Sequence, residues 1–253
     1  MEIVTIANKK GGIGKTTTAF NFAAGLTVRG KKVLAIDLDS QTNFSDTANP
    51  DMDAIGIYEV LCDGEDINDA IQNGKYFDFI SASRALTAAA KQLPDIGTEL
   101  TLKKALKKLD GSKYDYLVID TPPNVAELTC NALVATDTVI IPTNVEKYSL
   151  DGMIQLYEAV DKIRETYDKE IKIDGVLLTM YEKTLNNTKS LLPAFEGVAE
   201  NLGTSLYETK IRKNVKLSEA QTAKKSIFDY LPESAGAEDY GNFVNEFLKK
   251  REG

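Results

Sequence analysis

The sequence predicts an α/β fold: a doubly wound, mostly parallel β-sheet with helices on both faces. Short apolar runs rich in Val and Ile alternate with longer stretches of helical period, which is the order that builds such a sheet. Several of these runs read as continuously apolar rather than alternating, as strands buried on both faces do. The alternation continues through the 253 residues without a linker or an internal repeat, so we expect one domain over 1–253.

The expected elements follow from these runs in chain order. The predicted strands are 3–7, 33–37, 77–81, 116–120, 138–142 and 173–179, with a weaker strand at 205–210. The predicted helices are 15–29, 99–109, 127–135, 149–167, 187–202, 215–223 and 237–251. Ligands of parallel sheets bind at the edge where the carboxyl ends of the strands meet, so we expect the site there.

Composition narrows the chemistry that this chain can perform. The sequence has no histidine, which excludes Ser-His and Cys-His nucleophiles and His-ligated zinc. The two thiols, Cys62 and Cys130, form no C-x-x-C pair and are typical of a reduced, cytoplasmic protein. We find no leader peptide and no apolar run approaching the roughly 18 residues of a membrane span, so we expect a soluble protein.

The first predicted strand ends in a glycine-rich loop that leads directly into a helix. Residues 8–18 read NKKGGIGKTTT. The glycines permit positive φ and have no Cβ, so successive backbone N–H groups can point at a phosphate, and the helix N-terminus adds positive field. Lys15 is expected to contact the β- and γ-phosphates, and the Thr16 hydroxyl to ligate Mg²⁺. An ordinary glycine turn with a helix cap is the alternative.

The loop departs from the generic phosphate loop, because Lys9 stands where a glycine is usual. It fits Lys-Gly-Gly-x-Gly-Lys-[Ser/Thr], with an extra lysine at Lys10. In this the chain resembles the ParA/MinD group of P-loop ATPases, and most of all the ParA/Soj partition proteins. The resemblance implies that Lys10 reaches across a nucleotide-sandwiched homodimer to the partner's phosphates, where it acts with Lys15 in catalysis. A solvated surface lysine is the alternative for Lys10. The nucleotide-binding residues expected in the loop are Lys10, Gly11, Gly12, Ile13, Gly14, Lys15, Thr16 and Thr17.

Three acids follow predicted strands. Asp37 and Asp39 emerge on the same side of the second strand, because side chains alternate along a strand. They match the family's first switch, Asp-x-Asp-x-Gln, which implies that Asp39 orients or deprotonates the attacking water and that Asp37 lies near the metal. Asp120, before Thr-Pro-Pro, resembles a Walker B carboxylate in the second switch, Asp-x-Pro-Pro. The expected magnesium residues are therefore Thr16, Asp37 and Asp120, with helix caps or solvated loop acids as the alternative for the first two acids.

Two later segments, 178–181 and 211–220, resemble the family stretches near the adenine. The resemblance implies nucleotide contacts from Met180, Arg212 and Asn214. The usual form of the second segment begins Ile-Pro-Arg-Asn-Val-Arg, so this chain has Arg212 in place of a proline and Lys213 in place of an arginine.

A basic segment stands out in a chain whose net charge is −8. Residues 207–225 hold six lysines or arginines against two glutamates, a local excess of +4. Positive potential of this kind suits a phosphate backbone, and two such patches would add in a dimer. The resemblance makes Lys183, Lys213 and Lys216 the candidate DNA contacts, with a merely solvated basic surface as the alternative.

The last predicted helix has an apolar stripe at Tyr240, Phe243, Val244 and Phe247. MinD relatives bind membrane through a terminal amphipathic helix. Here the polar face mixes acids with lysines and offers little attraction to anionic lipid, so we expect the helix to pack on the core and no membrane partner.

The resemblance implies an ATP-dependent dimerising switch for plasmid or chromosome partition, with ATP and Mg²⁺ as cofactors. The ATP-bound homodimer would bind nonspecific DNA on the nucleoid, and a ParB-like centromere-binding protein would stimulate the hydrolysis that releases it. A MinD-like or cargo-positioning ATPase on a membrane or other surface is the main alternative. Metabolic enzymes with the same loop, such as dethiobiotin synthetase or the nitrogenase iron protein, are another.

Overall fold

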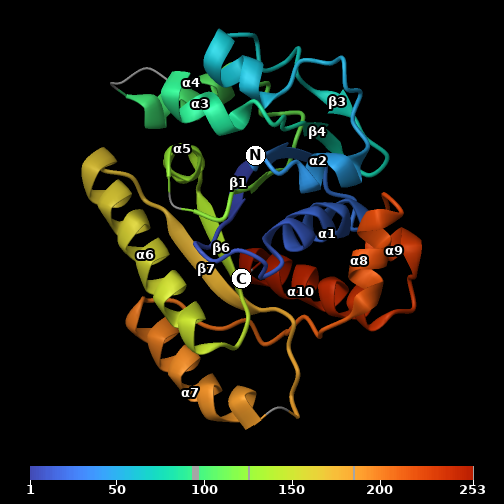
Figure 1. Ribbon diagram of the computed structural model, residues 1–253, viewed down its shortest axis with the longest axis vertical. Helices are drawn as coiled ribbons and strands as arrows, with labels where there is room; N and C mark the ends of the chain where they lie inside the picture. The colour runs from blue at the N-terminus through green and yellow to red at the C-terminus, as the bar shows by residue number, and fades with distance from the viewer. Residues whose placement is uncertain (93–96, 125, 185, 253) are drawn as a thin grey trace.

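The computed structural model describes residues 1–92, 97–124, 126–184 and 186–252, which form a sheet of seven strands with helices on both faces (Figure 1). The strand order is β3-β4-β2-β5-β1-β6-β7. Every neighbouring pair is parallel except β3–β4, which is antiparallel. The strands are β1 (Glu2–Ile6), β2 (Val33–Asp37), β3 (Gln72–Asn73), β4 (Asp78–Ile80), β5 (Tyr116–Asp120), β6 (Thr138–Thr143) and β7 (Lys172–Leu178). This confirms the predicted doubly wound fold.

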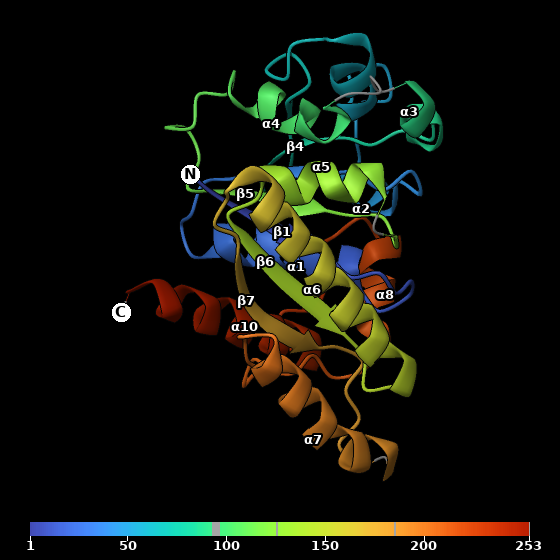
Figure 2. The same ribbon diagram turned by 90° about the vertical axis from the view of Figure 1, so that its left-hand side faces the viewer.

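The helices cover the sheet from both sides. Their bounds are α1 (Lys15–Val28), α2 (Asn43–Ala48), α3 (Leu86–Gln92), α4 (Thr101–Leu106), α5 (Glu127–Ala135), α6 (Lys147–Tyr167), α7 (Asn186–Asn201), α8 (Val215–Thr222), α9 (Ile227–Tyr230) and α10 (Ala235–Glu252). A π-helical turn, η1 (Glu59–Asp63), and a 3₁₀ turn, η2 (Thr98–Leu100), complete the described elements. Figure 2 shows α6 lying in front of β6 and β7.

Alternation along the strands divides the core into two faces. Val4, Ala35 and Val118 pack with α1 and α10 on one face, while Leu34 and Leu117 pack with α4 and α5 on the other. The central strands β2 and β5 are buried at every position, as their unbroken apolar runs predict. Because these strands are parallel, their carboxyl ends lie at the same edge of the sheet, beside the start of α1.

The prediction of a strand at 205–210 is wrong. Beside β7 this segment makes only an isolated bridge, between Val176 and Leu206. The next backbone N–H groups, of Glu208 and Thr209, donate instead to the carboxylate of Glu246 on α10, at 2.7 and 2.9 Å. The Glu246 side chain thus accepts the hydrogen bonds that a neighbouring strand would otherwise accept from this segment. The sequence also gave no sign of the short elements α2, α3, α9, β3 and η1, and the helix predicted at 99–109 is the η2 turn followed by α4.

The last helix packs on the core, as predicted. Phe243 and Phe247 are fully buried, and Phe247 meets Phe22 of α1 edge to face, with ring centroids 4.7 Å apart. Near the end of α10, Arg251 forms ion pairs with Glu2 of β1 and Asp174 of β7. Among the described residues no helix combines the length and the apolar character needed to cross a bilayer.

Candidate functional site: a nucleotide pocket at the sheet edge

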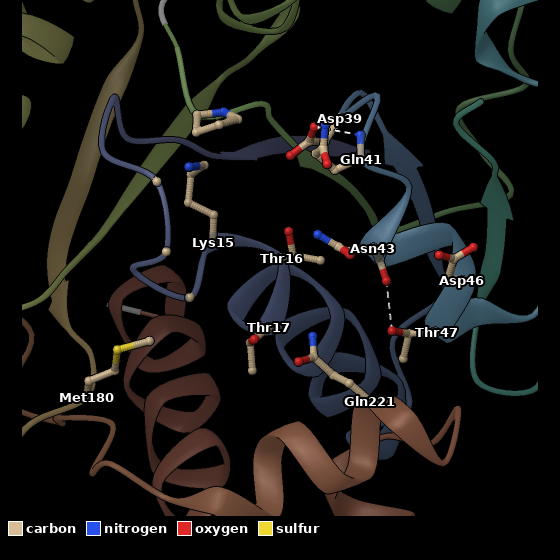
Figure 3. A pocket seen from close by; sticks show the side chains of 14 residues that line it. Lys15, Thr16, Thr17, Asp39, Gln41, Asn43, Asp46, Thr47, Met180 and Gln221 are labelled. Carbon is tan, nitrogen blue, oxygen red and sulfur yellow. Dashed lines mark hydrogen bonds between the residues drawn. The ribbon is translucent and has the colours of Figure 1, made fainter. Parts of the chain in front are cut away.

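A cavity of about 590 Å³ opens at the carboxyl edge of the sheet, over the start of α1 (Figure 3). The glycine loop and the loops after β2, β5 and β7 form its walls, together with α2 and α8. Its lining residues are Gly11, Gly12, Gly14, Lys15, Thr16, Thr17, Asp39, Gln41, Asn43, Asp46, Thr47, Pro123, Met180 and Gln221. The topology therefore brings together most of the loop residues that the sequence singled out.

The glycine loop has the backbone expected of a phosphate cradle. Gly12 and Gly14 have φ of 70° and 83°, and Gly14 directly precedes the first residue of α1. Ile13 does not line the cavity: its side chain is buried on the core side, and its carbonyl accepts a hydrogen bond of 2.7 Å from the Thr179 hydroxyl. Thr179, at the end of β7, thus holds the loop from behind, a role that the sequence did not indicate.

Lys15 lies at the base of the cavity. Its Nζ donates to the carbonyl of Lys10 at 3.0 Å, which folds the side chain back over the loop. Burial lowers the pKa of Lys15, while the nearby charges of Asp120 and Asp39 raise it. These acids therefore favour the charged ammonium that a phosphate needs.

Asp120 at the end of β5 is fully buried, and neither carboxylate oxygen has a hydrogen-bond partner among the described residues. Burial raises its pKa well above the ordinary value, and the charge of Asp37 adds to this; the nearby Thr16 hydroxyl and Lys15 oppose it. An unpartnered carboxylate in the interior is costly unless a cation joins it. Together with the Thr16 hydroxyl it offers the oxygen ligands that Mg²⁺ prefers beside phosphates, so these residues fit the predicted metal.

Asp37 is also fully buried, and both of its carboxylate oxygens accept hydrogen bonds from the protein. Its Oδ1 accepts from the Asp39 N–H at 2.9 Å, and its Oδ2 accepts from the N–H and the hydroxyl of Ser45 at 2.9 and 2.7 Å. Burial raises its pKa to about 6, against the effect of these hydrogen bonds. Asp37 thus fixes the loop between β2 and α2, and its expected place near the metal stays a prediction.

Asp39 faces the cavity from that loop (Figure 3). Only 7% of the residue is exposed, and its Oδ1 accepts from the Gln41 N–H at 3.0 Å. The hydrogen bond that the Asp39 N–H donates to Asp37, and the one that Asp39 accepts from Gln41, hold Asp39 at the wall opposite the start of α1, where it can meet a water molecule beside a bound phosphate. Its catalytic role stays a prediction that this position suits.

Lys10 does not line the cavity. Its Nζ donates to Glu146 Oε2 at 2.5 Å, to Asn144 Oδ1 at 3.2 Å and to Ser149 Oγ at 3.0 Å, all in the segment 144–149 that leads from β6 into α6. The Lys10 side chain is about one-quarter exposed, and that of Glu146 more than half exposed. In a single chain Lys10 is thus held on the rim, away from its own phosphate loop.

Of the three residues expected near the base of the nucleotide, one lines the cavity and two do not. Met180 lines the cavity with its side chain turned toward the start of α1 (Figure 3). The Arg212 guanidinium forms a two-pronged ion pair with Asp239 of α10 and reaches Glu238 as well. Asn214 caps α8 by accepting from the Lys216 N–H at 2.9 Å. The nucleotide contacts of these two side chains stay predictions.

Half of the six basic residues of 207–225 form ion pairs with acids among the described residues, namely Arg212 and two lysines. Lys213 bonds to Glu182 at 3.0 Å, Lys216 to Glu219 at 2.8 Å, and Lys183 is exposed nearby. Glu182, far from 207–225 in sequence, was not in the local charge count, so the positive potential of this surface is smaller than the count implies. The DNA contacts of Lys183, Lys213 and Lys216 stay predictions.

A doubly wound sheet, a glycine loop between β1 and α1, and acids at the ends of β2 and β5 define a P-loop nucleotide-binding protein. The family model described as an AAA domain matches residues 1–173. The sporulation initiation inhibitor protein Soj of Bacillus subtilis is 38% identical over 250 residues, covering 97% of each chain. The chromosome partitioning protein ParA of Myxococcus xanthus is 34% identical over 253 residues, covering 98% of this chain and 88% of that protein.

Structural comparison agrees with this assignment. The crystal structure of cobyrinic acid a,c-diamide synthase from Mycobacterium smegmatis with bound ATP analogue and magnesium is 27% identical, with a TM-score of 0.85, and covers 100% of this chain and 96% of that one. The chain belongs to the ParA/Soj family of P-loop ATPases. The family predicted from the loop and the strand-end acids is confirmed.

Proposed function

We propose that this ATPase is a nucleotide-dependent switch that partitions a plasmid or chromosome. Its cofactors are ATP and Mg²⁺, in keeping with the bound nucleotide and magnesium of the M. smegmatis structure. The observation that carries the switch is the position of Lys10. It belongs to the phosphate loop, yet its ammonium lies on the exposed rim rather than in its own cavity.

The residues of one chain account for nucleotide binding and hydrolysis. The N–H groups of the glycine loop and the Lys15 ammonium hold the phosphates. Thr16 and Asp120 would hold Mg²⁺, which offsets phosphate charge when it is bound with ATP. Asp39 accepts a hydrogen bond from the attacking water and orients it toward the γ-phosphate, so that water and ATP yield ADP and phosphate.

A second chain couples the bound nucleotide to dimer formation. When two chains face each other across ATP, Lys10 of each leaves Glu146 and contacts the phosphates bound by its partner. A ligand shared by two chains stabilises their association, so loss of the γ-phosphate weakens the dimer. The ATP dimer then doubles a basic surface too weak to hold DNA alone, and hydrolysis, stimulated by a ParB-like protein, releases it from the nucleoid.

The packing of α10 favours DNA over a membrane as the surface that this switch binds. Its apolar stripe, including Phe243 and Phe247, is buried against α1 and the sheet, so it offers no apolar face to lipid.

Light scattering of Lys10→Ala tests the dimer step. With ATP and magnesium we expect the wild type to dimerise, and the variant to bind nucleotide while staying monomeric. Lys9→Ala, which removes the exposed lysine next to it, is the matched control and should dimerise normally. A Lys10→Ala protein that dimerises like the wild type would contradict the proposal.

A further inference from the structure

We propose that Gln221 of α8 is a specificity-determining residue of the nucleotide pocket, whose side-chain amide hydrogen-bonds to the nucleoside part of the bound nucleotide. Gln221 lines the same cavity as the phosphate loop. Its amide has no hydrogen-bond partner among the residues that the structure describes, although it is only partly exposed. A half-buried amide with a donor and an acceptor both unused is suited to bind a ligand.

The position of Gln221 identifies which part of the nucleotide it meets. This step rests on the proposed function: phosphates bound by the loop from Gly11 to Lys15 would leave the rest of the nucleotide to extend past Thr17, the third residue of α1. Figure 3 shows the side chains of Met180 and Gln221 pointing toward Thr17 from opposite sides of the cavity. Met180 is apolar and 45% exposed, a surface for the face of a base, while Gln221 provides the polar contact.

Helix α8 is anchored at both ends, so the backbone of Gln221 is held in place beside the cavity. The preceding loop is bonded to the end of β7, where the Tyr181 N–H donates to the Ile211 carbonyl at 2.9 Å. Beyond the helix, the Lys224 Nζ donates to Asn49 Oδ1 at 2.7 Å, next to α2. Ala220, the neighbour of Gln221, is buried against the core. A fixed backbone keeps the amide within reach of the cavity, so binding costs only the rotamer freedom of one side chain.

Calorimetric titration of Gln221→Leu separates nucleoside contacts from phosphate contacts. With magnesium present, we expect its affinity for ADP to fall about 5- to 10-fold, the effect of one hydrogen bond. Its affinity for inorganic tripolyphosphate should not change. Thr222→Ala, an exposed change on the same helix, is the matched control and should bind ADP normally. Unchanged ADP affinity, or an equal loss for tripolyphosphate, would overturn the proposal.

Two analogues, titrated against the wild-type protein and Gln221→Leu, identify the hydrogen-bonded group. 2′-Deoxy-ADP lacks a ribose hydroxyl, and inosine diphosphate lacks the amino group of the base. The analogue that lacks the bonded group binds the wild type more weakly, and Gln221→Leu costs it no further affinity. If Gln221→Leu weakens both analogues as much as it weakens ADP, the bonded group is another atom of the base or the ribose; the proposal fails if the variant weakens tripolyphosphate as much as ADP. Gln221→Ala, which favours the helix, provides the same comparison should the leucine variant not fold.

Discussion

The contact between Lys10 and Glu146 gives the most direct prediction about the switch. Glu146→Gln removes the charge that holds Lys10 on the rim but keeps an oxygen able to accept its hydrogen bond. If Lys10 must leave this site to reach the partner's phosphates, the substitution lowers the free energy of that step. We therefore expect Glu146→Gln to strengthen the ATP-dependent dimer.

The size of the effect follows from the exposure of the pair. The side chains of Lys10 and Glu146 are 26% and 59% exposed, so the ionic part of the contact contributes only about 0.5–1 kcal/mol. Two such contacts break when a symmetric dimer forms, which gives about 1–2 kcal/mol in total and a dimer Kd that is lower by about 5- to 30-fold. The effect shrinks at high salt, because the surrounding ions screen exposed charges.

Sedimentation velocity across a range of protein concentrations, with ATP and magnesium, measures this Kd. Glu158→Gln is the matched control, because it makes the same charge change at an exposed position further along α6. A Glu146→Gln dimer with the Kd of the control, or a weaker one, would refute the idea that this ion pair restrains Lys10.

Further predictions concern the buried carboxylates. In EDTA and without nucleotide, Asp120→Asn should raise the Tm at pH 8 by about 2–4 °C, since it removes an unpartnered buried charge costing about 1 kcal/mol, while it abolishes Mg²⁺-dependent hydrolysis. Because the pKa of Asp120 is raised in the folded state, the folded protein binds a proton on this carboxylate more readily than the unfolded chain does, so the Tm advantage of the variant over the wild type should shrink as the pH is lowered from 8. Arg212→Met should lower the free energy of unfolding in urea by about 1–3 kcal/mol, because the nearly buried carboxylate of Asp239 loses its guanidinium partner and keeps the backbone N–H of residue 212. Lys213→Met is the control, because the ion pair of Lys213 with Glu182 is exposed and its loss should lower the free energy of unfolding by less than about 0.5 kcal/mol. Equal losses in the two variants would contradict the structural role of Arg212.

The sheet and the loop were predictable because their signals are local. Strands β2 and β5, which are buried on both faces, are apolar up to their final aspartate, and a glycine-rich segment such as 11–14 between a strand and a helix is typical of a phosphate loop. The segment 205–210 has a weaker strand pattern, and its backbone is bonded by Glu246, which lies on a distant helix. The local sequence could not show that competition.

The side-chain partners at the rim could not be predicted for the same reason. Lys10 and Glu146 are 136 positions apart, and Arg212 and Asp239 are 27 apart, so only the folded chain shows that they meet. The resemblance led to Arg212 and Asn214 as base contacts, whereas Gln221 carries no motif and is found only because α8 lies over the start of α1.

Co-sedimentation with DNA, in ATP, in ADP and without nucleotide, tests the switch itself most directly. With magnesium and low salt, we expect the wild-type protein to sediment with DNA in ATP alone, and the bound fraction to fall steeply as salt rises. Lys10→Ala should remain in the supernatant in all three states. Equal retention of the wild type in ATP, in ADP and without nucleotide would contradict the account.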